Sequence, residues 1–239
     1  MAKSYDSIVK YIRQSAGELK VSSARFFKTG EGEYAEHDKF LGVKVPTLRK
    51  IATDYTDIND STISSLLASP FNEIRFFALI ILTNKFRNGN PECREDVYNF
   101  YVDHLFSVNN WNLVDCSAHL IMGAYLYDKN REILAKLAKS ENLWERRISI
   151  VATWHFILRD DFKSTLEISK LLLHDNHDLI HKAVGWMLRE TGKRNRTVLT
   201  SYLKENCHNM HKTTLRYALE KFSDSERRSW LNKAKSKKP

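Results

Sequence analysis

Indole rings and charged side chains recur together in this sequence at spacings that place them on one face of a helix. The pattern comprises Trp111 with Asp115, Trp144 with Arg147, and Trp186 with Lys182 and Arg189. Residues three or four apart are neighbours on a helix surface, so each group presents an aromatic face beside a charge. One tryptophan in a helix is usually part of a core. Three such groups in similar segments instead favour a cleft lined by aromatic and charged side chains.

The segments that carry these groups are similar to one another and recur at intervals of roughly 30–40 residues, the range of helical-repeat proteins. One register position in them is filled by Arg75, Asp115, Arg147, Lys182 and Lys212. If this position faces a concave surface, a column of positive charge is interrupted by one carboxylate. A lone acid does not help phosphate binding, so it indicates another purpose. The alternative is that the position simply faces solvent, where charges of either sign are ordinary.

Other catalytic patterns are absent from the sequence. It contains no Gly-rich phosphate loop, no G-x-S-x-G and no H-E-x-x-H. His174 and His177 lie three apart beside Asp175 and Asp178, a run more typical of an inter-helix loop with an Asp N-cap than of a metal site. We therefore expect no metal. The many lysines leave a Schiff-base nucleophile open.

Helical periodicity of the apolar residues extends over almost the whole chain, and strand-like alternation is nowhere sustained. The predicted helices are 4–20, 46–55, 62–68, 73–86, 92–106, 112–127, 131–138, 144–158, 164–173, 178–190, 197–204, 211–221 and 225–233. The fold class is all-α. Stacked helix pairs form a curved solenoid with one concave face. We expect one domain over residues 1–239, with a flexible basic tail at 233–239.

Net charge favours a polyanionic partner. Lys and Arg number 38 against 29 Asp and Glu, a balance of +9, and each phosphate neutralised by a cation releases a condensed counterion. Many soluble proteins are basic, so charge alone is not specific. The longest apolar run, Phe76–Leu82, is far shorter than the roughly 18 residues that cross a bilayer. The N-terminus lacks a signal-peptide core, and three scattered cysteines suit a reducing compartment.

Five motifs, in order along nearly the whole chain, resemble those of the DNA alkylation repair family of AlkD-like glycosylases. They are Phe26–Tyr34 with Asp38–Arg49, Asn110–Asp115, Trp144–Arg147, Lys182–Glu190, and Leu215–Phe222. Each motif alone is weak, but five in register are specific. The resemblance implies a HEAT-like repeat superhelix that binds duplex DNA in a concave basic groove. It also implies a monomer that hydrolyses the N-glycosidic bond of N3- or N7-alkylated purines, with no cofactor and without deep base flipping.

The resemblance also implies roles for individual residues. The family's catalytic aspartate corresponds to Asp115, and its two cleft tryptophans correspond to Trp111 and Trp186. The family's DNA-contacting arginine corresponds to Arg147. The full set of expected DNA-binding cations is Arg147, Arg75, Lys182, Arg189 and Lys212. An alkylated purine is cationic and leaves through a transition state like an oxocarbenium ion, so a carboxylate near the sugar and π faces beside it suit the reaction.

The sequence departs from the family's pattern at two positions. Asn112 stands where many members carry a second acid, and His119 where proline is common. Neither residue has an assigned role, so the departures affect only the expected lesion, which stays open. Members without the aspartate bind DNA without excision, and this chain retains it. The competing hypotheses are a non-catalytic binder of damaged or branched DNA and a protein scaffold. The expected location is the cytoplasm, at the nucleoid in a bacterium, or the nucleus in a eukaryote.

Overall fold

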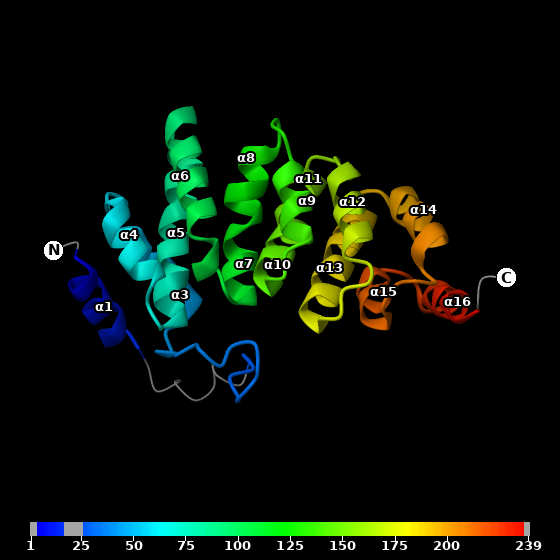
Figure 1. Ribbon diagram of the computed structural model, residues 1–239, viewed down its shortest axis with the longest axis horizontal. Helices are drawn as coiled ribbons and strands as arrows, with labels where there is room; N and C mark the ends of the chain where they lie inside the picture. The colour runs from blue at the N-terminus through cyan, green and yellow to red at the C-terminus, as the bar shows by residue number, and fades with distance from the viewer. Residues whose placement is uncertain (1–3, 17–25, 237–239) are drawn as a thin grey trace. The chain divides into compact units, whose positions relative to one another are not determined.

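The computed structural model describes residues 4–16 and 26–236, and the regular elements in this part of the chain are helices joined by turns and loops (Figure 1). An isolated parallel bridge between Lys39 and Phe71 is the one β-type pairing among these residues. The last part of the predicted helix 4–20 and the end of the predicted tail lie outside the described residues. None of the described helices is long and apolar enough to span a membrane. The all-α prediction is confirmed.

The chain contacts divide into two compact units, Met1–Ser117 and Ala118–Pro239. The helices of the first unit are α1 (Tyr5–Gln14), α3 (Val45–Ala52), α4 (Asp60–Leu67), α5 (Asn72–Asn88), α6 (Pro91–Asp103), the 3₁₀ turn Leu105–Ser107 and α7 (Trp111–Ser117). Helix α5 is central, because α3, α4, α6 and α7 all pack against it. Its residues from Asn72 to Thr83 are all buried, as expected for a helix that is surrounded on every side.

The second unit begins with a π-helical turn, His119–Gly123. Its remaining helices are α8 (Ala124–Leu126), α9 (Glu132–Ala138), α10 (Leu143–Ala152), α11 (Trp154–Ile157), α12 (Lys163–Leu171), α13 (Asp178–Arg194), α14 (Arg196–Asn206), α15 (Lys212–Ala218) and α16 (Asp224–Lys235). Helix α13 is the centre of this unit and packs against α10, α12, α14 and α15. Pairs of neighbouring helices are therefore the building block of both units.

Three predicted helices are divided in the structure. The predicted helix 92–106 is α6 followed, after His104, by the 3₁₀ turn Leu105–Ser107. The predicted helix 144–158 is α10 followed by α11, with Thr153 between them. Thr153 is fully buried, and its hydroxyl donates to the Ile150 carbonyl at 2.7 Å, a back-bond that bends helices. The predicted helix 112–127 is α7, the π-helical turn and α8. π-helical turns are often found at functional sites, and this one follows α7 directly.

One domain over residues 1–239 and a flexible tail at 233–239 both stay predictions. Lys233 to Lys235 of that tail belong to α16, which ends at Lys235 with its C-cap at Ser236. Residues 237–239 of the predicted tail lie outside the described residues.

Candidate functional site

Helix α7 carries Trp111 and Asp115 on one side and its core residues on the other. Leu113 and Val114 are fully buried, whereas Trp111, Asn112 and Asp115 are half-buried. These apolar residues fix the orientation of α7 about its own axis against α5. In this orientation the carboxylate of Asp115 stays within reach of solvent. The side chain is neither sealed inside the protein nor fully exposed. A carboxylate of this kind can stabilise a positive charge or orient a water molecule.

The indole of Trp111 belongs to a stack of three aromatic rings. The Phe27 ring lies between the other two, 5.0 Å from the Trp111 ring at an interplanar angle of 18°, and 4.7 Å from the Phe40 ring at 24°. Offset stacking of this kind contributes about 0.5–1.5 kcal/mol beyond burial. Because Phe27 covers one face of the indole, only the opposite face of Trp111 is available for a ligand.

A buried carboxylate, Asp38, connects the segment that carries Phe27 to helices α5 and α7. Its two oxygens accept hydrogen bonds from three side chains: the guanidinium of Arg75, the amide of Asn72 at 2.8 Å and the amide of Asn110 at 2.6 Å. The Asp38 side chain is fully buried. The three hydrogen bonds therefore compensate the cost of removing its charge from water.

Two further hydrogen-bonding groups strengthen this connection. Asn112 donates to the Asn72 side-chain oxygen at 2.7 Å. The Glu73 carboxylate accepts from the backbone N–H of Leu41 at 3.0 Å and of Gly42 at 2.8 Å. Side chains at the start of α5 therefore hold the 38–42 segment in place, and that segment leads into Phe40 and the ring stack beside Trp111.

Arg75 is not placed as the sequence predicts. It is only 3% exposed, and its guanidinium is bonded to Asp38 and to the Ser69 carbonyl, the latter at 2.7 Å. These contacts occupy the guanidinium, which neutralises the Asp38 carboxylate. DNA binding by Arg75 stays a prediction, which this burial does not favour.

A further cation, Arg49, acts on the residue that follows Asp115. Burial raises the pKa of the Cys116 thiol, the negative charge of Asp115 raises it further, and the positive charge of Arg49 opposes both. Arg49 is exposed on α3, so an exposed cation of α3 and the carboxylate of α7 both act on this thiol.

In the second unit, Trp186 lies in an aromatic cluster. The Trp154 ring is 5.0 Å from the Trp186 ring in an edge-to-face arrangement, and 4.5 Å from the ring of His119. Trp186 is half-buried on α13. His119, one of the two departures from the family's pattern, thus contributes a ring to the cluster that holds Trp186. Trp144, in contrast, is 8% exposed, so it belongs to the core and not to a cleft.

Arg147 is also buried, at 5% exposed. One nitrogen of its guanidinium donates to the Leu179 carbonyl at 2.6 Å, which connects α10 to the first turn of α13. The guanidinium therefore has a structural contact of its own. DNA binding by Arg147 stays a prediction.

The remaining predicted cations are more accessible. Lys182 is half-buried and pairs with Asp178 one turn earlier, at 2.7 Å. Arg189 forms an ion pair with Glu220 of the loop after α15. Lys212 is exposed at the start of α15. At the shared register position Arg75 and Arg147 are buried, Asp115 and Lys182 are half-buried, and Lys212 is exposed. Equivalent positions in the repeats therefore differ in their access to solvent.

The His174–Asp178 run is a loop, as predicted, but its N-cap is a histidine. The Nδ1 atom of His177 accepts from the Leu179 N–H at 3.1 Å and caps α13. Asp175 instead accepts from the His177 N–H and pairs with Arg146. Among the described residues, no group of His, Cys, Asp and Glu is arranged to hold a metal ion.

Sequence reasoning did not identify the side chains that position Trp111 and Trp186. The first unit brings Trp111 and Asp115 together and adds Phe27 and Arg49, while the second holds Trp186 through Trp154. Phe27 and Arg49 lie inside the motifs that resemble the family, and this was their only signal in the sequence.

Comparisons with known proteins place these residues in a family. The family model for the DNA alkylation repair enzyme matches residues 13–222. No curated protein sequence matches the chain. A solved structure of a predicted DNA alkylation repair enzyme from Enterococcus faecalis is similar with a TM-score of 0.66 at 14% identity, covering 87% of this chain and 96% of that one.

A second solved structure, AlkD2 from Streptococcus mutans, is similar with a TM-score of 0.56 at 18% identity, covering 92% of this chain and 100% of that one. At these identities the likeness shows the fold, an all-α superhelical arrangement of HEAT-like repeats. The family match covers most of the sequence and includes every predicted site residue. The chain therefore belongs to the DNA alkylation repair enzyme family.

Proposed function

We propose that this protein is a monofunctional DNA glycosylase that hydrolyses the N-glycosidic bond of N3- or N7-alkylated purines in duplex DNA. Its membership in the DNA alkylation repair enzyme family supports a role in DNA alkylation repair. The single observation that carries the proposal is the placement of Asp115, a half-buried carboxylate four residues after Trp111 on the same helix.

The substrate determines what the protein must supply. Alkylation at N3 or N7 gives the purine a positive charge, and the bond to C1′ is already weakened. When that bond breaks, its electron pair stays with the purine, which leaves as a neutral base, and the positive charge moves to the sugar. Water then adds its oxygen to C1′ and loses one proton. The transition state resembles that of glycoside hydrolysis.

Asp115 acts on the sugar in this reaction. Its negative charge stabilises the developing cation at C1′, and its oxygens orient the attacking water and accept the proton that the water loses. No acid is needed to activate the leaving group, so the reaction requires neither a metal nor an organic cofactor.

Trp111 and Trp186 offer π faces to the cationic lesion and sugar, each contact being worth about 0.5–2 kcal/mol. The Phe27 ring stacks against one face of the Trp111 indole. The Trp154 ring contacts the Trp186 indole in an edge-to-face arrangement. Rings fixed in this way lose little conformational entropy when a ligand binds. Arg147, Lys182, Arg189 and Lys212 are the cations proposed to contact phosphates, without reading sequence.

The proposed partner is double-stranded DNA that contains alkylated purines, and the proposed active form is a monomer in the cytoplasm or nucleus. The test is an incubation of the purified protein with duplex DNA carrying N7-methylguanine or N3-methyladenine, followed by chromatography of released bases. We expect free alkylated base together with an uncut strand that alkali then cleaves at the abasic site. DNA binding without base release would instead indicate a non-catalytic binder of damaged DNA.

A further inference from the structure

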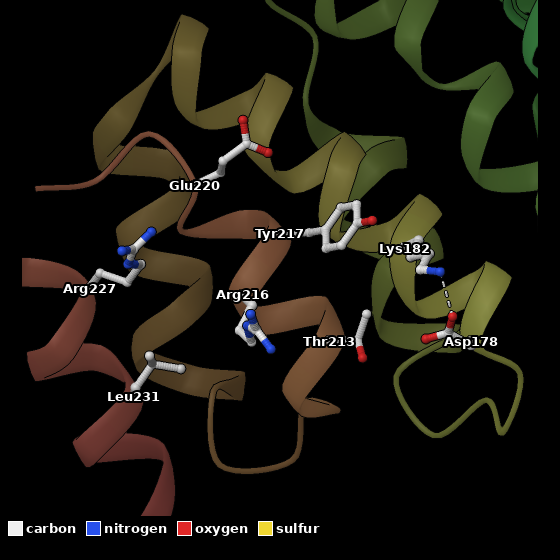
Figure 2. Close-up of a pocket in the computed structure, with 8 residues that line it drawn as sticks. All are labelled: Asp178, Lys182, Thr213, Arg216, Tyr217, Glu220, Arg227 and Leu231. Atoms are coloured by element: carbon white, nitrogen blue, oxygen red, sulfur yellow. Dashed lines mark ion pairs between the residues drawn. The ribbon is translucent and has the colours of Figure 1, made fainter. Parts of the chain in front are cut away.

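The second unit contains an open cleft in which only Lys182 has a predicted role. Eight residues line it: Asp178, Lys182, Thr213, Arg216, Tyr217, Glu220, Arg227 and Leu231. They come from α13, from α15 with the loop after it, and from α16, and the cleft has a volume of about 670 Å³. Figure 2 shows the Asp178–Lys182 pair at one end and Arg227 with Leu231 at the other. Its size is within the range of ligand sites, roughly 300–1,000 Å³.

The close approach of α13 and α15 shapes this cleft. A Cβ atom added to Gly185 would lie 2.5 Å from the Tyr217 Cβ and 2.6 Å from the Thr214 carbonyl oxygen. Glycine is therefore required at this position of α13. The approach brings Lys182, on the preceding turn of α13, beside the Thr213 and Tyr217 side chains of α15 (Figure 2).

Both acids of the cleft already have cationic partners. Asp178 pairs with Lys182 at 2.7 Å. Glu220 pairs with Arg189 and with Lys221; burial raises its pKa, but these two cations lower it more, so the net shift is downward. Arg227 is paired as well, with Asp224 at 2.8 Å. The charges of both acids are thus balanced by cations within the protein.

Arg216 differs from the other charged residues of the cleft. Its side chain makes no hydrogen bond or ion pair to any residue that the structure describes, and it is exposed on α15. The guanidinium is a planar fork of donors that matches a phosphate group bidentately. The hydroxyl groups of Thr213 and Tyr217, beside it in the cleft, are further donors to an anionic oxygen.

We propose that this cleft binds a backbone phosphate of duplex DNA, with Arg216 as the principal contact and Lys182, Thr213 and Tyr217 beside it. The proposal rests on the proposed function for the identity of the ligand as DNA, and it assigns a role to the Leu215–Phe222 motif. Lys182, which pairs with Asp178 at 2.7 Å, lines the same cleft and adds a second positive charge to it.

A phosphate diester suits the cleft better than a nucleotide. The open cleft has a single apolar wall at Leu231 and no stack of aromatic rings for a base. The protein also carries a net charge of +9, which attracts a long polyanion from a distance. The ligand is therefore recognised by charge and shape along its backbone, independent of base sequence.

The experiment measures binding of a fluorescent, undamaged duplex to the full-length protein by anisotropy over a series of salt concentrations. Arg216→Ala should lower affinity about tenfold at low salt and reduce the slope of log K against log salt by about 1. Arg228→Ala is the matched control, because Arg228 is an exposed arginine on α16 that does not line the cleft. It should change the slope by less than half as much.

Two results would overturn the proposal. The first is an equal effect of Arg216→Ala and Arg228→Ala, which would mean that only overall charge matters. The second is saturable binding of inorganic phosphate, measured by calorimetry and lost in Arg216→Ala, which would assign the cleft to a free anion. Because the duplex carries no lesion, this test is independent of base release, so either proposal can fail without the other.

Discussion

Two arginines at one register position illustrate how burial decides the role of a side chain. Arg75 and Arg147 were expected to contact DNA with Lys182 and Lys212, because all four occupy equivalent places in the repeats. Arg75 is instead 3% exposed and neutralises Asp38, and Arg147 is 5% exposed and bonds to the Leu179 carbonyl. The register of a repeat fixes the direction of a side chain from its helix. The neighbouring segments decide whether solvent reaches it.

The buried pair of Arg75 with Asp38 gives a prediction on stability. Arg75→Met should lower the free energy of unfolding by about 3–5 kcal/mol, because it leaves the charge of Asp38 buried without its cation. Urea denaturation of the full chain measures this change. Arg87→Met, at an exposed position on the same helix, is the control and should stay within about 0.5 kcal/mol of wild type. Unaltered stability of Arg75→Met with weaker DNA binding would instead support DNA binding by Arg75.

At the scale of the elements, the periodicity of apolar residues predicted nearly every helix of the described chain. Helices α5, α6, α12, α13 and α14 begin within one residue of their predicted starts. The breaks were not predictable, since they depend on contacts between distant segments. The division of α10 from α11 involves the buried hydroxyl of Thr153. The anchoring of the segment that carries Phe27 depends on Asp38 and Glu73, which bond to residues more than 30 positions away.

Two glycines of α13 provide a matched pair of substitutions. Gly185→Ala places a Cβ 2.6 Å from the Thr214 backbone oxygen, which cannot move without shifting α15. Gly192→Ala places a Cβ 2.3 Å from the end of the flexible Leu199 side chain, which can turn aside. Both substitutions gain up to about 1 kcal/mol of helix propensity.

Gly185→Ala should therefore be destabilised by about 1–3 kcal/mol, while Gly192→Ala should be close to wild type or more stable. Thermal unfolding followed by circular dichroism compares the two variants. Equal melting temperatures would show that α15 can shift to make room for a Cβ atom at position 185. The close approach of α13 and α15 would then not require glycine there.

At the scale of the whole molecule, the sequence was sufficient for the fold class and the family. The net charge of +9 and five motifs in register pointed to DNA, and the family match now places the chain among DNA alkylation repair enzymes. What the sequence could not provide was the surroundings of each site residue. The ring stack on Trp111, the cluster around Trp186 and the cleft at Arg216 arise only when the helices pack.

The proposed function requires the carboxylate of Asp115 to promote the loss of the alkylated base. Single-turnover release of N7-methylguanine, with the protein in excess over the duplex, tests it most directly. Asp115→Asn should slow release by at least about 100-fold while DNA affinity is unchanged or higher, because a negative charge is removed. Asp96→Asn, the same substitution at an exposed position on α6, should release base like wild type. Release by Asp115→Asn at the wild-type rate would contradict the account.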